Sequence, residues 1–304
     1  MTRRRGLVLA AVTAAAGAIV VATIRARSPR RRAHPVLQGG PLLIAHRGGA
    51  GLAPENTMTA FLQASADWHS DMIELDVQAS ADGRCMVIHD PSVDRTTDGT
   101  GAVADMTAAE LGELDAGYRF TRDGTTYPFR GRGVRIPTIE DVLDALPDMR
   151  LTIEIKDGRA QRPLLDAIRR FQATPRVIVA GMYARDRRLF DHYEGAISAS
   201  SEMLRAAIIA HRMRLDGFLP VKFDVAQMPE WHEGRRILDP GLVRALHRRG
   251  IPVHVWTVND PADMERLLDW GVDGLLTDRP DLAEQVLHHR FNRPLAPGHA
   301  RATD

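Results

Sequence analysis

The sequence predicts an α/β fold, a closed (β/α)8 barrel, from two observations. Short apolar segments rich in β-branched residues alternate with amphipathic segments of helical period across residues 41–290. Several amphipathic segments also begin with Asp-Pro and end with Gly, as in DPGLVRALHRRG and DPADMERLLDWG. About eight such units in roughly 250 residues fit a barrel better than an open doubly wound sheet, and no dinucleotide-binding glycine fingerprint follows the first strand.

The predicted strands are short apolar runs. They cover residues 42–46, 72–77, 85–89, 151–156, 176–181, 196–200, 217–223, 253–258 and 273–278. The predicted helices lie between them, at residues 55–69, 138–147, 161–173, 184–193, 202–214, 239–249 and 261–270. Strands that alternate with helices in this way favour a parallel sheet covered by helices.

Residues 1–40 are predicted to be a membrane-directed segment followed by a linker. An uncharged run of 19 residues, 6–24, at about 1.5 Å per residue nearly crosses a bilayer core of about 30 Å. Arginines flank it on both sides and no obvious small-residue cleavage site follows, which favours a single transmembrane anchor over a removed signal peptide. The arginine excess after the run favours a cytoplasmic barrel, whereas export would place it outside, so the side of the membrane stays open.

Two further regions stand outside the barrel pattern. Residues 90–136 are rich in Gly, Asp, Thr and Arg, with only a weak helix near residues 107–115. They are predicted to be an insertion over one end of the barrel, either a lid or specificity wall or a solvated excursion. Residues 291–304 are expected to form a disordered tail.

Charge and cysteine content exclude some classes of function. The chain of 304 residues carries 40 basic and 39 acidic residues, so it lacks the positive excess needed for sequence-independent nucleic-acid binding. The single cysteine, Cys85, excludes an intramolecular disulfide framework and a cysteine-built metal site, and is expected to be a small core residue. Any metal must therefore bind oxygen or imidazole ligands.

Three carboxylates are predicted to meet inside the barrel. Side chains two residues apart in a strand share a face, so Glu74 and Asp76 point together, as do Glu154 and Lys156 on another strand. Three carboxylates from two strands would form an oxygen-rich site suited to Mg²⁺ or Ca²⁺. The alternative is an internal ion pair of Lys156 with Glu154 or Asp76.

Two histidines end strands at the edge of the barrel where active sites lie. His46 ends the first strand and His89 ends the third, beside the acidic cluster. Cleavage of a phosphodiester needs a general base and a general acid on opposite sides of phosphorus, and Arg47, Lys156 and a cation would neutralise the phosphoryl charge. The glycines after Arg47 let the chain turn off the strand.

The chain resembles the glycerophosphodiester phosphodiesterase family. The resemblance runs through HRG and PENT at 46–57, ELDVQASADGRCMVIHDPSVDRTTDGTG at 74–101, RIPTIEDVL at 135–143, LTIEIK at 151–156, VWTVN at 255–259 and DGLLTDRP at 273–280. It covers essentially the whole chain beyond residue 40. It implies a TIM barrel over residues 41–290 that hydrolyses glycerophosphodiesters to sn-glycerol 3-phosphate and an alcohol with a divalent cation, Ca²⁺ or Mg²⁺.

The resemblance also implies residue roles. His46 and His89 would be the acid and base pair, in an order that the sequence does not assign. The implied metal ligands are Glu74, Asp76 and Glu154, and the implied phosphate contacts are Arg47 and Lys156.

Other matched positions have two interpretations. Glu55 is expected in the first turn of a helix with Pro54 at its first position, or in a polar contact to substrate. Trp256 would pack on the glycerol carbons or simply fill the barrel top. Asn259 and Asp278 are expected to be turn and cap residues.

Three functions are therefore weighed. The first is a membrane-anchored, metal-dependent phosphodiesterase acting on soluble glycerophosphodiesters, with no nucleic acid and no obligate protein partner. The second is a lysophospholipase D that uses the same site. The third, a non-catalytic phosphopolyol-binding barrel, would show a missing ligand or histidine, and none is missing.

Overall fold

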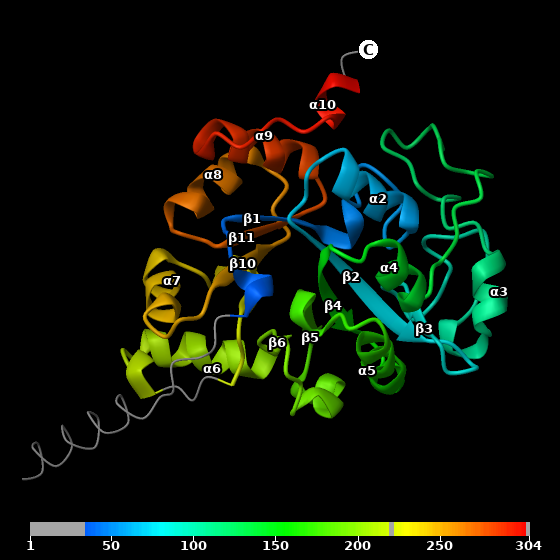
Figure 1. Cartoon of the computed structure of the whole chain (residues 1–304). Coiled ribbons are helices and arrows are strands. Elements are labelled where there is room, and N and C mark those ends of the chain that lie inside the picture. The colour runs from blue at the N-terminus through cyan, green and yellow to red at the C-terminus, as the bar shows by residue number, and fades with distance from the viewer. Residues whose placement is uncertain (1–33, 219–221, 302–304) are drawn as a thin grey trace, which may run out of the picture.

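Eight parallel strands form the centre of the protein (Figure 1). The computed structural model describes residues 34–218 and 222–301. The parallel strands are β1 (Leu42–Ala45), β2 (Met72–Ala79), β4 (Arg150–Ile155), β5 (Val177–Gly181), β6 (Ala196–Ile197), β7 (Ala226–Pro229), β10 (Val253–Trp256) and β11 (Gly274–Thr277). They pair in the order β6-β5-β4-β2-β1-β11-β10-β7, and a parallel bridge between Ser198 and Val225 joins the two ends. The predicted barrel fold is confirmed.

Helices surround the strands (Figure 1). They are α2 (Met58–Ala66), α4 (Ile139–Ala145), α5 (Gln161–Arg170), α6 (Ser201–Arg212), α7 (Pro240–His247), α8 (Pro261–Asp269) and α9 (Pro280–Phe291). The predicted Asp-Pro starts are present: the side chain of Asp239 accepts hydrogen bonds from the first turn of α7, and Asp260 does the same for α8. Proline at the first helical position and aspartate before it fix where these helices begin.

Alternation along the strands divides the core into two layers. Ile73, Leu75 and Val77 of β2 are buried against the helices, as the period of two predicts. Residues of opposite parity point into the barrel. At one end of the interior they are apolar, as Leu42, Ile44 and Met72 are, and there they pack together with Val36 of the 3-10 turn η1 (Pro35–Leu37). The other end of the interior carries the charged residues.

Three predicted elements differ from the structure. The strand predicted at 217–223 is wrong: residues Asp216–Phe218 form a 3-10 turn, η7, residues 219–221 lie outside the described residues, and the strand is β7. The sequence of β7, AQMP, contains no β-branched residue, so local propensity does not mark it as a strand. The run at 85–89 forms only β3 (Cys85–Val87), antiparallel to β2 and outside the barrel wall. The helix expected at 184–193 is the 3-10 segment η6 (Ala184–Phe190).

The insertion is an ordered unit with its own small core. It contains the turn η3 (Val103–Asp105) and the helix α3 (Ala108–Glu113), and lies beside α2 and α4 (Figure 1). Val93, Val103, Leu111 and Val134 are buried there together with Met86 and Ile88 of the preceding segment. Tyr127 of the insertion, by contrast, is 37% exposed.

The tail that was expected to be disordered is packed on the barrel as far as His299. The guanidinium of Arg293 donates two hydrogen bonds to Asp71, at 2.8 and 2.9 Å, and Ala296 is buried. His299 contacts Glu284 of α9, and the helix α10 (Gly298–Arg301) follows. Residues 302–304 lie outside the described residues.

The predicted membrane segment also lies outside the described residues, within 1–33. Among the helices of residues 34–218 and 222–301, none has the length and apolarity needed to cross a bilayer.

We predict that Arg293→Ala lowers the free energy of unfolding by about 1–3 kcal/mol, because it removes a bidentate, three-quarters-buried bond to a carboxylate that also accepts the Leu43 N–H. Urea unfolding of the full chain measures this. Arg162→Ala, which breaks an exposed pair with Asp166 on α5, is the control and should be nearly neutral. Equal losses in the two variants would contradict the packed tail.

Candidate functional site

The chain leaves β1 through a sharp turn that presents two functional side chains. The 3-10 turn η2 (His46–Gly48) has Arg47 at φ 51°, and Gly48 and Gly49 follow at 83° and 92°. A Cβ on Gly48 would lie 2.7 Å from a ring carbon of Phe61 in α2. Only glycine fits there, so the glycines serve the turn and its close packing on α2. His46 and Arg47 are left at the carboxyl end of the barrel.

A cleft of about 260 Å³ opens at this end. Eight of the nine predicted site residues line it, all except Glu55: His46, Arg47, Glu74, Asp76, His89, Glu154, Lys156 and Trp256. Met182, Ser198, Leu204 and Gln227 line it as well. The structure therefore brings together residues from both ends of the sequence, as expected of the carboxyl ends of barrel strands.

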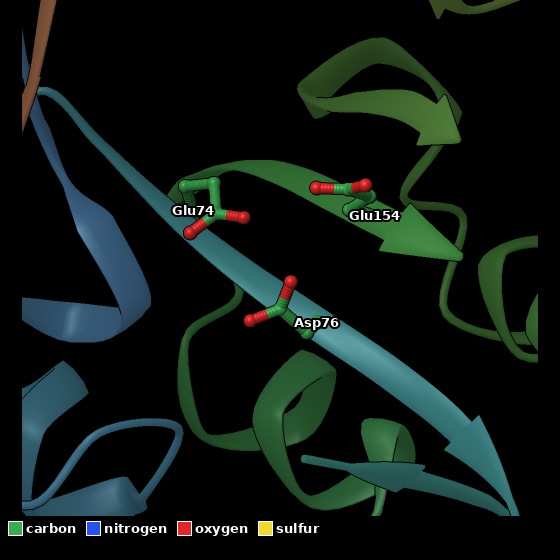
Figure 2. A group of neighbouring side chains, drawn as sticks. All are labelled: Glu74, Asp76 and Glu154. Atoms are coloured by element: carbon green, nitrogen blue, oxygen red, sulfur yellow. The ribbon is translucent and has the colours of Figure 1, made fainter. Parts of the chain in front are cut away.

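Three carboxylates converge at the cleft. Figure 2 shows Glu74 and Asp76 on β2 and Glu154 on β4, with side chains pointing toward a shared space. One oxygen from each lies within 4.8 Å of the others. Burial, together with the charges of Asp76 and Glu154, raises the pKa of Glu74 to about 8. The three carboxylates repel one another, and all the ligand atoms they offer are oxygens. Both properties fit a hard divalent cation.

The ion pair weighed against a metal site is also present. Lys156 Nζ lies 3.2 Å from Asp76 Oδ1 and 3.0 Å from Glu154 Oε2. Burial alone would raise the pKa of Asp76, but Lys156 and Arg47 outweigh it, so this pKa is lowered. Arg47 Nε also lies 3.4 Å from Asp76 Oδ2, so two side-chain cations face three carboxylates, and the ion pairs and a metal cation are compatible.

His46 is held by a carboxylate from the last strand. Its Nδ1 lies 2.7 Å from Asp278 Oδ1, and its Nε2 lies 3.9 Å from Glu74 Oε2. A carboxylate only accepts, so Nδ1 carries the proton that is donated to Asp278. Burial lowers the pKa of His46, but Glu74 and Asp278 raise it more, and the net shift is upward. Asn259 Nδ2 donates to Asp278 at 2.8 Å and completes the support.

Sequence reasoning treated Asp278 and Asn259 as turn and cap residues and missed this contact. The available signal was positional. Ala45 pairs with Thr277 in the β1–β11 register, so the next residue of each strand, His46 and Asp278, stands at the same rim. That register is a property of the closed barrel.

His89 is held in a similar way by its neighbour in sequence. Its Nδ1 lies 2.6 Å from Asp90 Oδ1, and Gln78 Nε2 donates to its backbone oxygen at 2.9 Å. Burial raises the pKa of Asp90, but the lowering by Arg95 and His89 is larger, and the resulting pKa is about 2. Both histidines thus engage Nδ1 with a carboxylate, which leaves each Nε2 for the cleft.

Glu55 lies behind Arg47. Its Oε1 accepts a hydrogen bond from Arg47 Nη1 at 2.9 Å, and both of its carboxylate oxygens accept from Arg95. The prediction that Glu55 sits in the first turn of a helix is wrong, because α2 begins at Met58 after the Thr57 cap and Asn56 has φ 57°. Asn56 instead donates to Asp76 Oδ2 at 2.9 Å.

The two residues on β10 have different surroundings. Trp256 is 39% exposed and lines the cleft. His254, two residues earlier, is fully buried in the barrel interior, and burial lowers its pKa to about 3. His254 is therefore a neutral residue that fills the barrel interior.

Known proteins match this chain over most of its length. The profile of the glycerophosphoryl diester phosphodiesterase family matches residues 46–162 and 196–282. A glycerophosphodiester phosphodiesterase of Caldanaerobacter subterraneus subsp. tengcongensis is 35% identical over 251 residues, 79% of this chain and 95% of that protein. A probable glycerophosphodiester phosphodiesterase 2 of Mycobacterium tuberculosis is 36% identical over 262 residues, 82% and 91% of the two chains.

Two further similarities are relevant to fold and substrate. The crystal structure of a glycerophosphoryl diester phosphodiesterase domain from Mycobacterium tuberculosis superimposes with a TM-score of 0.72 at 27% identity, covering 81% of this chain and 99% of that one. A lysophospholipase D of Homo sapiens is 25% identical over 281 residues, 81% of this chain and 86% of that protein.

We predict that MgCl₂ or CaCl₂ raises the melting temperature of the protein, because a cation that binds only the folded state stabilises it by mass action. Glu154→Gln, which removes one carboxylate of the three, should abolish most of this shift. Asp166→Asn, an exposed carboxylate of α5, is the control and should leave the shift intact. The ion that gives the larger shift at equal concentration is the preferred one. An undiminished shift in Glu154→Gln would count against the metal site.

Proposed function

The chain belongs to the glycerophosphoryl diester phosphodiesterase family and hydrolyses glycerophosphodiesters to sn-glycerol 3-phosphate and an alcohol, and we propose that it does so in the cleft described above. One observation carries this assignment of the site. Two histidines, each with Nδ1 on a carboxylate, share the cleft with three converging carboxylates. A non-catalytic barrel would have lost part of this set.

His46 and His89 are the proposed acid and base pair. Hydrolysis removes a proton from the attacking oxygen and delivers one to the oxygen of the leaving alcohol. The Nε2 atoms are the ring nitrogens that carry these protons, since each Nδ1 is held by Asp278 or Asp90. The carboxylates also stabilise whichever ring becomes an imidazolium during the reaction.

Glu74, Asp76 and Glu154 would hold the divalent cation, Ca²⁺ or Mg²⁺. When bound, such an ion neutralises charge that develops on the phosphoryl oxygens. Arg47 and Lys156 line the same cleft and are the proposed phosphate contacts. Trp256 offers an exposed aromatic face to the glycerol carbons.

A water-soluble substrate is favoured over a lysophospholipid. An acyl chain would need an apolar wall, and the insertion buries Val93, Val103, Leu111 and Val134 in a small core with Met86 and Ile88. Arg95 of the insertion donates hydrogen bonds to Glu55 and Asp90. The similarity to the human lysophospholipase D keeps that substrate as the second candidate.

We predict that the natural chain, supplied with Mg²⁺ or Ca²⁺, releases sn-glycerol 3-phosphate from glycerophosphocholine or glycerophosphoethanolamine. His46→Ala should lower the rate about 10²- to 10⁴-fold, because a general acid or base is lost. His192→Ala, an exposed histidine in the segment after η6, is the control and should retain full activity. Undiminished release by His46→Ala would refute the proposed site, and faster turnover of lysophosphatidylcholine in the same assay would favour the second candidate.

We also propose that residues 6–24 anchor the barrel to a membrane. The support is the uncharged 19-residue run with arginines on both sides. We expect the full chain to sediment with membranes and to resist carbonate extraction, whereas a chain that begins at residue 34 stays in the supernatant. Recovery of the full chain in the supernatant would refute the anchor. Protease accessibility of the barrel in intact cells then reports its side.

A further inference from the structure

We propose that Arg95 of the insertion is a positioning residue that sets the geometry of both halves of the site at once. Its guanidinium holds two carboxylates, Glu55 and Asp90, and these in turn hold Arg47 and His89. The inference rests on the function proposed for the cleft. It gives the insertion a defined part in the reaction.

The guanidinium uses three of its donors on two different carboxylates. Arg95 Nη1 and Nη2 donate to the two oxygens of Glu55 at 2.7 and 2.8 Å, and Nε donates to Asp90 Oδ2 at 2.6 Å. This is the planar fork that distinguishes arginine from lysine, and it fixes two carboxylates relative to one plane.

Each carboxylate has a second partner that lines the cleft. Glu55 Oε1 also accepts a hydrogen bond from Arg47 Nη1 at 2.9 Å, and Asp90 Oδ1 also accepts one from His89 Nδ1 at 2.6 Å. A continuous chain of charge-assisted bonds therefore runs from Arg47 through Glu55, Arg95 and Asp90 to His89. It joins the turn after β1 to the segment after β3, which are more than 30 residues apart in the sequence.

Arg95 acts through these partners and not on the substrate. His89 and Arg47 are among the residues that line the cleft, whereas Glu55, Asp90 and Arg95 are not among the described residues that do so. The Arg95 side chain is 47% exposed, whereas its partners Glu55 and Asp90 are 16% and 27% exposed, so this network also contributes to folding stability. The effect that identifies positioning is therefore the fall in kcat of the folded variant.

The backbone around Arg95 is anchored well enough to hold the guanidinium in one position. Val93 and Thr97, two residues on either side, are fully buried. Thr97 donates to the Val93 carbonyl both from its backbone N–H, at 3.1 Å, and from its hydroxyl, at 2.8 Å. The turn that carries Arg95 is thus anchored in the core of the insertion.

The test compares Arg95→Ala with Arg84→Ala in the full chain. Arg84 is a matched control, because its side chain is 50% exposed and pairs with Glu140 at 3.2 Å, away from the cleft. With glycerophosphocholine as substrate, we expect Arg95→Ala to lower kcat about tenfold to a hundredfold, since small misplacements of catalytic groups have effects of this size. We expect Arg84→Ala to stay within twofold of the natural chain, and both variants to melt within a few degrees of it.

A double-mutant cycle separates positioning from a general loss of charge. If Arg95 acts partly through Glu55, the loss in the Arg95→Ala, Glu55→Gln double variant is smaller than the product of the single losses. Arg95→Lys offers a point charge in place of a fork, so its kcat should lie between those of the alanine variant and the natural chain. The lysine variant also serves if the alanine variant does not fold.

Two results would overturn the proposal. One is a kcat within twofold of Arg84→Ala for every folded Arg95 variant, and the other is a set of losses in the cycle that simply multiply. Neither can be confused with failure of the proposed function, which would appear as no release of sn-glycerol 3-phosphate by the natural chain in the same assay.

Discussion

The concentration of negative charge where β2 and β4 reach the carboxyl end of the barrel is the constraint on which the site depends. Glu74 and Asp76 are 4% and 1% exposed, and buried carboxylates this close destabilise the fold unless opposite charge or hydrogen-bond donors surround them. Lys156, the backbone N–H of Arg47 and the amide of Asn56 all donate to this cluster. Arg47 and Lys156, the residues proposed to contact the phosphate, are therefore also among those that stabilise the buried carboxylates.

The opposite end of the barrel interior allows this arrangement. Leu42, Ile44 and Met72 close it with apolar side chains, and they lie on the same strand faces that carry charge a few residues later. Burial of apolar side chains is the main favourable contribution to folding. The apolar end of the interior therefore stabilises the same strands whose charged end contributes little of this kind. Strands β1 and β2 thus stabilise the fold at their beginnings and present proposed site residues at or just after their ends.

Patterns within one strand were predictable from the sequence, whereas contacts between distant segments were not. A period of two was enough to place Glu74, Asp76 and Glu154 inside and Ile73 and Leu75 outside. Strand β7 was missed because AQMP has no such pattern, and its place is set by pairing with β10. Local propensity gives no information on partners such as Asp71 and Arg293, which lie 222 positions apart. The tail was therefore expected to be disordered.

The two histidines differ in what maintains their orientation. The partner of His89 is its neighbour Asp90, so that pair can form without closure of the barrel, and it gains its fixed direction from Arg95. The partner of His46 is Asp278, 232 positions away, and the two meet only because β1 pairs with β11. Separation of those strands would release His46 while leaving the His89 pair intact. A two-histidine mechanism consequently makes closure of the sheet between its first and last strands a condition for activity as well as for stability.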